Sequence, residues 1–249
     1  MKPIRRPRPL HVPQYAVAVQ SPLIALILSV ATAASAQDIA SQQAAWEKMA
    51  EARHNALVRQ WGTGTDPELR EKLAGLYRRD QDGRKFMVTL PQAQWTVAMG
   101  QQQRNEDAAL TSQLKEIVAS RGWPTFRLVG VNGSGQAMLI LNHSADHAWQ
   151  STMLPQLEKL AQGGEIDGSD LAGFVDKTLI AAGRLQRYGT KFNFVDGKMH
   201  MFAVEDPEHL AERRERAFLP PMPLYKHLLA TMYHLRETDE IAQPAPAKP

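Results

Sequence analysis

The stretch LQRYGTKFNFVDGKMHMF, Leu185–Phe202, interrupts a chain that otherwise has the apolar spacing of successive helices. Asp196 and Gly197 form a favoured two-residue turn between apolar-rich strands, because both central positions of such a turn take positive φ and glycine tolerates it freely. A turn of this length places Phe192 opposite Met201. The stretch therefore predicts an antiparallel β-hairpin.

The first part of this hairpin carries polar side chains on its apolar face. Side chains alternate along a strand, so Gln186, Tyr188 and Thr190 share the face of Phe192 and Phe194. We therefore expect an amide and two hydroxyls to point inward, where they can donate and accept hydrogen bonds without charge. Two roles stay open: these groups bind a polar ligand, or they satisfy helix ends.

On both sides of the hairpin, apolar residues recur at three- and four-residue steps, which is typical of helices. Asp66-Pro67, a capping residue followed by proline, predicts the start of one helix, and Asp146 predicts the start of another. After a predicted loop at 131–135, the run Ala137–Leu141 is apolar in every direction and is predicted as a buried helix. The expected fold is mainly α with a small antiparallel β-hairpin, as a single helical domain after an N-terminal signal peptide.

The first 36 residues have the pattern of a secretory signal peptide. Four basic side chains precede the apolar run Leu23–Ala34, and small residues at Ala34 and Ala36 suit a peptidase that cuts before Gln37. The apolar run is too short to serve comfortably as a membrane anchor. We therefore expect an exported protein, periplasmic or secreted, that is cleaved after Ala36 and has no stable membrane anchor afterwards.

Removal of residues 1–36 changes the net charge of the protein, and with it the class of partner that the charge indicates. The whole chain has a formal net charge of +3, but residues 1–36 hold four basic and no acidic side chains, so the remainder has a charge of −1. Such a balance gives no reason to expect nucleic-acid binding. The chain has no cysteine, which excludes disulfides and zinc–thiolate sites. The expected partner is an unknown small molecule or a component of the cell envelope.

The order of these elements divides the rest of the chain into three segments. We expect residues 37–65 to form an N-terminal helix and linker, and residues 66–236 to form one helical domain with the hairpin near 186–204. The end of the chain, 237–249, is rich in proline and is expected to be disordered.

Six short motifs occur in a fixed order: DQDGR (80–84), GWPT (122–125), NHSAD (142–146), WQ (149–150), GRLQRYGTKF (183–192) and RRERAFLPPMPLY (213–225). Together they resemble a bacterial family, domain of unknown function 6624, over about residues 66 to 230. The resemblance implies a shared fold and a shared site, and it implies no activity. The chain departs from the family pattern at Lys177 and Lys191, where the family commonly has arginine and glutamine. If those positions bind a ligand bidentately, lysine alters the geometry.

Three residues are candidates for catalysis. His143 and Asp146 lie three positions apart, close enough on a continuous helix for the carboxylate to orient the imidazole as a general base. Tyr188 is the third candidate, as a donor that stabilises charge. Asp146 is equally well placed to cap the next helix, and His143 to be an ordinary interior residue. His147 would complete an HxxDH pattern, which has no established metal geometry, so no metal site is predicted.

The candidates for ligand binding come from several parts of the domain. They are Gln186, Tyr188, Thr190, His143, Asp176 and Gln150. Asp176 could instead form a structural ion pair with Arg184, Arg187 or another cation at the edge of the core. No nucleophile elbow, phosphate loop, HExxH or dinucleotide motif occurs, and no cofactor is predicted.

Three functions remain open from the sequence. The first is a small-ligand-binding or interaction domain with a polar pocket, formed where the start of the hairpin meets His143 and Asp146. The second is an envelope hydrolase with His143 as general base, oriented by Asp146 or Asp176, and with Tyr188 or an arginine to stabilise charge. The third is a purely structural domain in which every motif serves packing.

Overall fold

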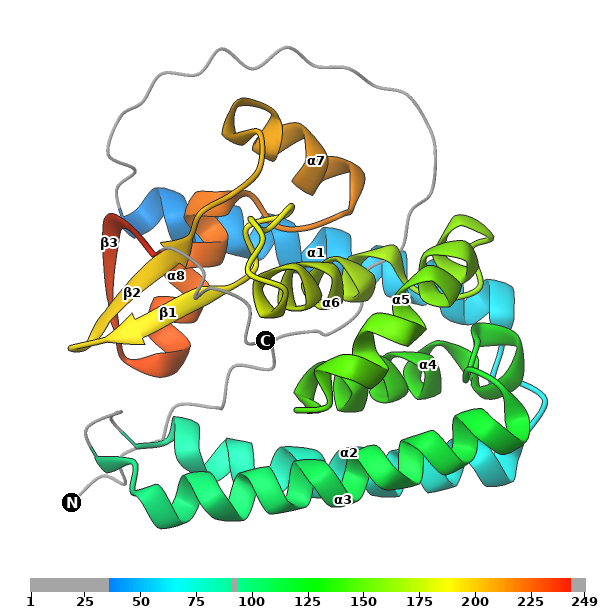
Figure 1. Ribbon diagram of the computed structural model, residues 1–249. Helices are drawn as coiled ribbons and strands as arrows, with labels where there is room; N and C mark the ends of the chain where they lie inside the picture. The colour runs from blue at the N-terminus through cyan, green and yellow to red at the C-terminus, as the bar shows by residue number, and fades with distance from the viewer. Residues whose placement is uncertain (1–35, 91–93, 243–249) are drawn as a thin grey trace, which may run out of the picture.

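The computed structural model describes residues 36–90 and 94–242, and within them the chain is mainly helical (Figure 1). The helices are α1 (Ala36–Trp61), α2 (Pro67–Val88), α3 (Val97–Arg121), α4 (Phe126–His143), α5 (His147–Gln162), α6 (Gly168–Ala181), the 3₁₀ helix η2 (Pro207–His209), α7 (Leu210–Arg216) and α8 (Met222–Tyr233). The strands are β1 (Phe192–Val195), β2 (Lys198–Phe202) and β3 (Arg236–Ala242). The predicted fold class is confirmed. The predicted signal peptide lies outside the described residues, except for its last residue.

The helices α2 and α3 lie side by side, and α4 packs against both of them (Figure 1). The predicted start of α2 is confirmed, since Asp66 accepts a hydrogen bond from the Leu69 N–H at 2.9 Å and Pro67 is the first helical residue. Asp146 caps α5 in the same way, by accepting from the Trp149 N–H at 2.9 Å. These local capping signals fix where the helices begin.

The predicted loop at 131–135 is wrong, because these residues belong to α4. Only Gly130 departs from helical geometry, with φ 71° and ψ 175°, and it kinks the helix. A Cβ at Gly133 would lie 2.8 Å from the Val129 side chain and 3.8 Å from Arg70 of α2. Glycine is therefore needed beside Val129 of the same helix, and the packing of α4 against α2 outweighs the weak helix propensity of glycine.

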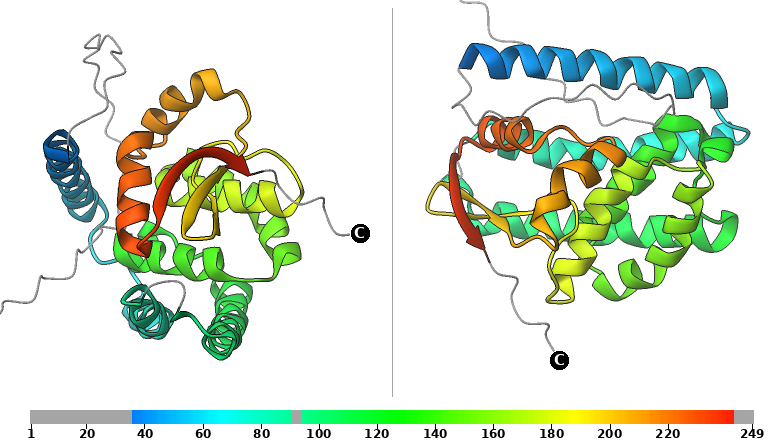
Figure 2. Two further views of the ribbon diagram at one scale, coloured as in Figure 1. Left: turned by 90° about the vertical axis from the view of Figure 1, so that its left-hand side faces the viewer. Right: turned by 90° about the horizontal axis from the view of Figure 1, so that it is seen from above.

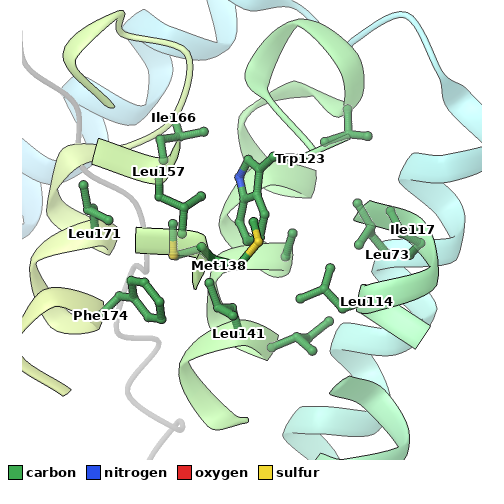
Figure 3. Packing of buried hydrophobic residues seen from close by; sticks show 14 of the residues in the cluster. Leu73, Leu114, Ile117, Trp123, Met138, Leu141, Leu157, Ile166, Leu171 and Phe174 are labelled. Carbon is green, nitrogen blue, oxygen red and sulfur yellow. The ribbon is translucent and has the colours of Figure 1, made fainter. Parts of the chain in front are cut away.

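The main core lies between α2, α3, α4, α5 and α6. Figure 3 shows Met138 and Leu141 of α4 between Leu114 on one side and Phe174 on the other. Ala137–Leu141, predicted as a buried helix, thus runs through the middle of this core. Each such aliphatic side chain contributes about 1.5–3 kcal/mol when fully buried, so this core holds the ends of α2, α4 and α6 in fixed positions.

The predicted hairpin is confirmed in register, with Phe192 opposite Met201 in β1 and β2. The strands begin later than residue 186, because the chain turns at Gly189 (φ 68°) and only residues from 192 onward pair as β1. Met199 is fully buried against α8 and its neighbours.

The third strand, β3, pairs with β2 in parallel, which gives the order β1-β2-β3 (Figure 2). Disorder was predicted from residue 237 onward, and for 237–242 this is wrong. An unpaired edge of β2 would leave backbone donors and acceptors open, and β3 satisfies them. Residues 243–249 of the predicted tail lie outside the described residues.

The first helix, α1, packs along α4 and α8 (Figure 2). It is held by Arg53, which lies 3.3 Å from Asp167 and stacks on the ring of Phe218 at 4.1 Å from its centroid. Of the helices within the described ranges, none combines the length and the apolar character needed to cross a membrane.

Candidate functional site

Six ionisable side chains from α2, α3, α4, α6 and the segment before β1 gather at the C-terminal end of α4. We call this set the polar cluster: Asp80, Arg84, Asp107, His143, Lys177 and Lys191. Ion pairs join its first four members, and electrostatic interaction couples Lys177 to Lys191, Asp107 and Arg84. The main core positions the helices that carry it.

The centre of the polar cluster is a histidine–aspartate pair. His143 Nδ1 lies 2.7 Å from Asp80 Oδ1, and the Asp80 side chain is fully buried. Arg84, one turn further along α2, donates to the same oxygen at 3.0 Å. Gln81 donates to the other oxygen, Oδ2, at 2.7 Å. The carboxylate is therefore held in place and fixes the orientation of the imidazole.

The pKa values of this pair favour an ionised carboxyl beside a neutral ring. Burial acts to raise the pKa of Asp80, but the hydrogen bond and charge of His143 and the charge of Arg84 together lower it. Burial lowers the pKa of His143, and it outweighs Asp80, whose hydrogen bond and charge act to raise that pKa. In neutral solution Nδ1–H then donates to Asp80, and the lone pair lies on Nε2.

The Nε2 atom of His143 is available for chemistry. The side chain is 25 % exposed, and within the described part of the chain no residue forms a hydrogen bond with Nε2. An imidazole whose Nδ1 is held by a carboxylate and whose Nε2 forms no hydrogen bond with the described residues has the arrangement of a general base. It can equally accept a hydrogen bond from a ligand hydroxyl.

Arg84 connects the pair to α3. Its Nη2 lies 2.9 Å from both oxygens of Asp107, and Gln103 donates to Asp107 at 3.0 Å. The charge of Arg84 is thus shared between Asp80 and Asp107. Its role in this geometry is to support the aspartates.

Two lysines complete the polar cluster. Lys177 donates to the carbonyl of Asn142 at 2.6 Å and to the carbonyl of Ser144, so it binds the C-terminal end of α4 on both sides of His143. Lys191 is partly buried, and its Nζ would lie 3.7 Å from a Cβ added at Gly173. Neither lysine forms an ion pair with a carboxylate within the described ranges, and Lys191 forms no side-chain hydrogen bond there.

The pKa values of both lysines are lowered, mainly by burial. Burial, followed by the charge of Lys191, lowers the pKa of Lys177 to about 8, while Asp107 acts to raise it. Burial also lowers the pKa of Lys191, against the attraction of Asp176. Both ammonium groups are therefore destabilised relative to water, and an anion between them would relieve this.

Asp176 is occupied by the backbone of the hairpin segment. Its fully buried carboxylate accepts from the N–H groups of Arg187, Tyr188 and Thr190 and from the Thr190 hydroxyl, at 2.7–2.8 Å. Asp176 does not form the suggested ion pair with Arg187, because Arg187 pairs with Glu205 at 2.7 Å, and no ion pair with Arg184 occurs among the described residues. Asp176 and Thr190 together fix the loop that carries Lys191.

Gln186 and Gln150 also satisfy backbone groups. Gln186 is fully buried, accepts from the Lys191 N–H at 2.9 Å and donates to the Lys191 and Phe202 carbonyls at 3.1 and 2.7 Å. Gln150 donates to the carbonyls of Leu141 and Ser144 at 2.7 and 3.1 Å. The inward orientation predicted for Gln186 is confirmed, and its polar atoms meet the protein's own chain.

The structure does not bring Asp146 or Tyr188 to His143. The predicted pairing of Asp146 with His143 assumed a continuous helix, but α4 ends at His143, and Asp146 instead caps α5 and pairs with Lys115 at 2.5 Å. Tyr188 lines an open depression of about 500 Å³ with Arg213 and Arg216, and His143 is not part of its lining.

Asp80, the true partner of His143, was not predicted in that role. A signal for it exists in the sequence, because Asp80 follows Leu69, Leu73 and Leu76 at helical spacing and so lies on the buried stripe of α2. Lys177 and Lys191 were singled out only as departures from the family pattern. Among the residues that the structure describes, no group of three His, Asp or Glu side chains could hold a metal ion.

Comparison with known proteins gives a family without a known activity. The model of a family of unknown function (DUF6624) matches residues 67–238. No curated protein and no solved structure matches the chain.

Proposed function

The chain belongs to the family of unknown function (DUF6624), and on that basis we propose that it is a small-ligand-binding domain that holds a small oxyanion between Lys177 and Lys191, beside His143. The observation that supports this most is Lys191, whose ammonium group forms no ion pair within the described ranges and interacts with a second ammonium. The carboxylate that attracts it, Asp176, already accepts four hydrogen bonds from the hairpin segment. A small oxyanion here means a carboxylate or a phosphate.

The charges of the site explain this choice of ligand. Two ammonium groups that repel each other in a partly buried place are unfavourable unless a negative charge offsets them. The carboxylates of Asp80 and Asp107 are already paired with His143 and Arg84. An oxyanion would accept charge-assisted hydrogen bonds from both lysines, and a hydroxyl next to it could donate to Nε2 of His143.

Isothermal titration calorimetry with inorganic phosphate, in a buffer free of other oxyanions, tests the proposal. Lys191→Gln should weaken phosphate binding about tenfold, because one charge-assisted hydrogen bond is lost. Lys198→Gln is the matched control, since Lys198 is 40 % exposed on the same sheet and lies 3.7 Å from Glu240. Absence of binding to the unmodified protein, or equal affinity in Lys191→Gln, would remove the proposed ligand.

The His143–Asp80 pair favours a second function, that of an envelope hydrolase. His143 Nε2 would take a proton from a water molecule that attacks the ester carbonyl, and would return it to the departing alkoxide as the ester C–O bond breaks. Asp80 would have the orienting role that the sequence had suggested for Asp146. Lys177 or Lys191 would stabilise the developing oxyanion.

Hydrolysis of p-nitrophenyl phosphate and p-nitrophenyl acetate tests this second function. His143→Gln should lower the rate about 100-fold or more if His143 is the base. His209→Gln replaces a histidine that is 60 % exposed and serves as the control. Rates that do not differ between the two variants would exclude His143 as the base.

We also propose that the protein is exported, on the sequence pattern of residues 1–36. Expression of the whole chain in a bacterium, followed by fractionation and N-terminal sequencing, tests this. A chain that begins at Gln37 in the periplasm or the medium is expected. An unprocessed chain confined to the cytoplasm would contradict it.

A further inference from the structure

An apolar cavity of about 310 Å³ lies between α1, α4, α6 and α8. Pockets for small molecules occupy roughly 300–1,000 Å³, so this cavity suits a compact ligand. Its walls include the apolar side chains of Trp46, Met138, Leu139, Phe218, Leu228 and Leu229. No member of the polar cluster lines it.

One buried polar atom in the wall lacks a partner. The carboxamide oxygen of Asn142 is buried and accepts no hydrogen bond within the described part of the chain. A buried acceptor of this kind is unfavourable unless a ligand or a water molecule donates to it. In an otherwise apolar cavity, Asn142 therefore favours a ligand that carries an N–H or O–H group.

The charges around the cavity disfavour an anionic ligand. Its described lining contains Glu47 and Asp170 and contains no lysine, arginine or histidine. Burial, followed by the charge of Asp167, raises the pKa of Asp170 well above its ordinary value, which favours the uncharged acid. A fatty acid or another anionic amphiphile would meet these acidic groups without a cation to offset its charge.

The helix α1 forms one wall of the cavity. It contributes Gln43, Trp46, Glu47 and Ala50, and it lies before the region that matches the family. The rings of Trp46 and Phe218 pack with centroids 4.9 Å apart, which joins α1 to the chain segment before α8. Figure 2 shows α1 along this side of the domain.

We propose that this cavity binds an uncharged, mainly apolar small molecule with one N–H or O–H donor, which the side chain of Asn142 accepts. The site is distinct from the oxyanion site at Lys177 and Lys191. Its ligand lies against α1, which forms one wall of the cavity.

N-phenyl-1-naphthylamine is a suitable probe, because it is uncharged, apolar, carries one N–H and fluoresces in apolar surroundings. Titration into the purified protein should give a saturable rise in fluorescence. Ala50→Phe fills the cavity from α1 and should weaken binding at least about tenfold. Val58→Phe adds the same ring at a position of α1 that is 37 % exposed and outside the lining, and it should leave the dissociation constant unchanged.

Two comparisons on the unmodified protein make the test independent of whether Ala50→Phe folds. 1-Phenylnaphthalene lacks the N–H and should compete about three- to tenfold more weakly, a difference that Asn142→Ala should abolish. 1-Anilino-8-naphthalenesulfonate adds an anion and should also compete more weakly. Lack of saturable binding, equal affinity of 1-phenylnaphthalene, or undiminished binding to a folded Ala50→Phe protein would overturn the proposal.

Discussion

Replacement of Asp176 by asparagine should destabilise the protein strongly, although it changes a single atom of the side chain. Asp176 is fully buried, and its two oxygens accept four hydrogen bonds from the segment Arg187–Thr190. In Asp176→Asn, one oxygen can keep its two backbone donors. The new NH₂ group then faces the N–H of Thr190, which cannot become an acceptor.

The magnitude follows from these contacts. One buried N–H is left without an acceptor, which costs about 1–3 kcal/mol, and the remaining hydrogen bonds lose the charge that makes them stronger, which costs about 1–2 kcal/mol more. We therefore expect the free energy of unfolding to fall by about 2–5 kcal/mol. Asp239→Asn is the matched control, since Asp239 is fully exposed and lies 3.5 Å from Lys226, and it should cost less than about 1 kcal/mol.

Urea unfolding followed by circular dichroism gives the free energy of unfolding of both variants. The slope of that free energy against urea concentration, the m-value, should be the same in both. A loss below about 1 kcal/mol in Asp176→Asn would refute the reasoning, because four hydrogen bonds to a buried carboxylate cannot be removed or weakened at so small a cost. Such a result would return Asp176 to the candidates for ligand binding.

Three further predictions rest on neighbouring contacts. An imidazole NMR titration should give His143 a pKa below 6.5, and Asp80→Asn should lower this pKa further because Asp80 acts to raise it; a midpoint at or above 6.5 would contradict the direction of the shift. As the pH falls below 6.5, the unfolded chain binds a proton at His143 that the folded chain does not, so the contribution of His143 to stability declines. Gln186→Leu removes three hydrogen bonds and should cost about 2–4 kcal/mol in urea unfolding, whereas an unchanged midpoint would show that they contribute nothing. Gly189→Ala (φ 68°) and Gly197→Ala (φ 69°) should both lose about 1–2 kcal/mol from backbone strain. The two losses should be similar, because the new Cβ at Gly189 would meet, at 2.5 Å, only the terminal methyl of Met222, which can move aside; a much larger loss at Gly189 would contradict this.

Local signals predicted the parts of the fold that depend on a few adjacent residues. Asp66-Pro67 predicted the start of α2, and Asp196-Gly197 predicted the register of β1 with β2. The continuation of α4 through 131–135 was not predictable in this way, because it depends on the packing of α4 against the distant helices α2 and α3. Pairing of β3 with β2 likewise depends on a contact between distant segments.

The candidate site was harder to predict from the sequence than the fold, because its contacts join distant segments of the chain. His143 was identified, but its partner Asp80 lies 63 residues earlier in the chain, and sequence spacing cannot show that α2 and α4 pack against each other. The polar residues of the hairpin segment were expected to point inward, and Gln186 and Thr190 do so. Whether an inward polar group meets a ligand or the protein itself depends on tertiary contacts. Here the Gln186 amide meets backbone groups, and the Thr190 hydroxyl donates to the Asp176 carboxylate.

The claim that an oxyanion binds between two lysines can be measured most directly on Lys177 itself. Side-chain NMR of the lysine ammonium groups gives its pKa with and without saturating inorganic phosphate. We expect a value of about 8 without phosphate and a clear rise towards 10.5 with it, because a bound anion favours the charged lysine. A pKa of Lys177 that phosphate leaves unchanged would contradict the claim.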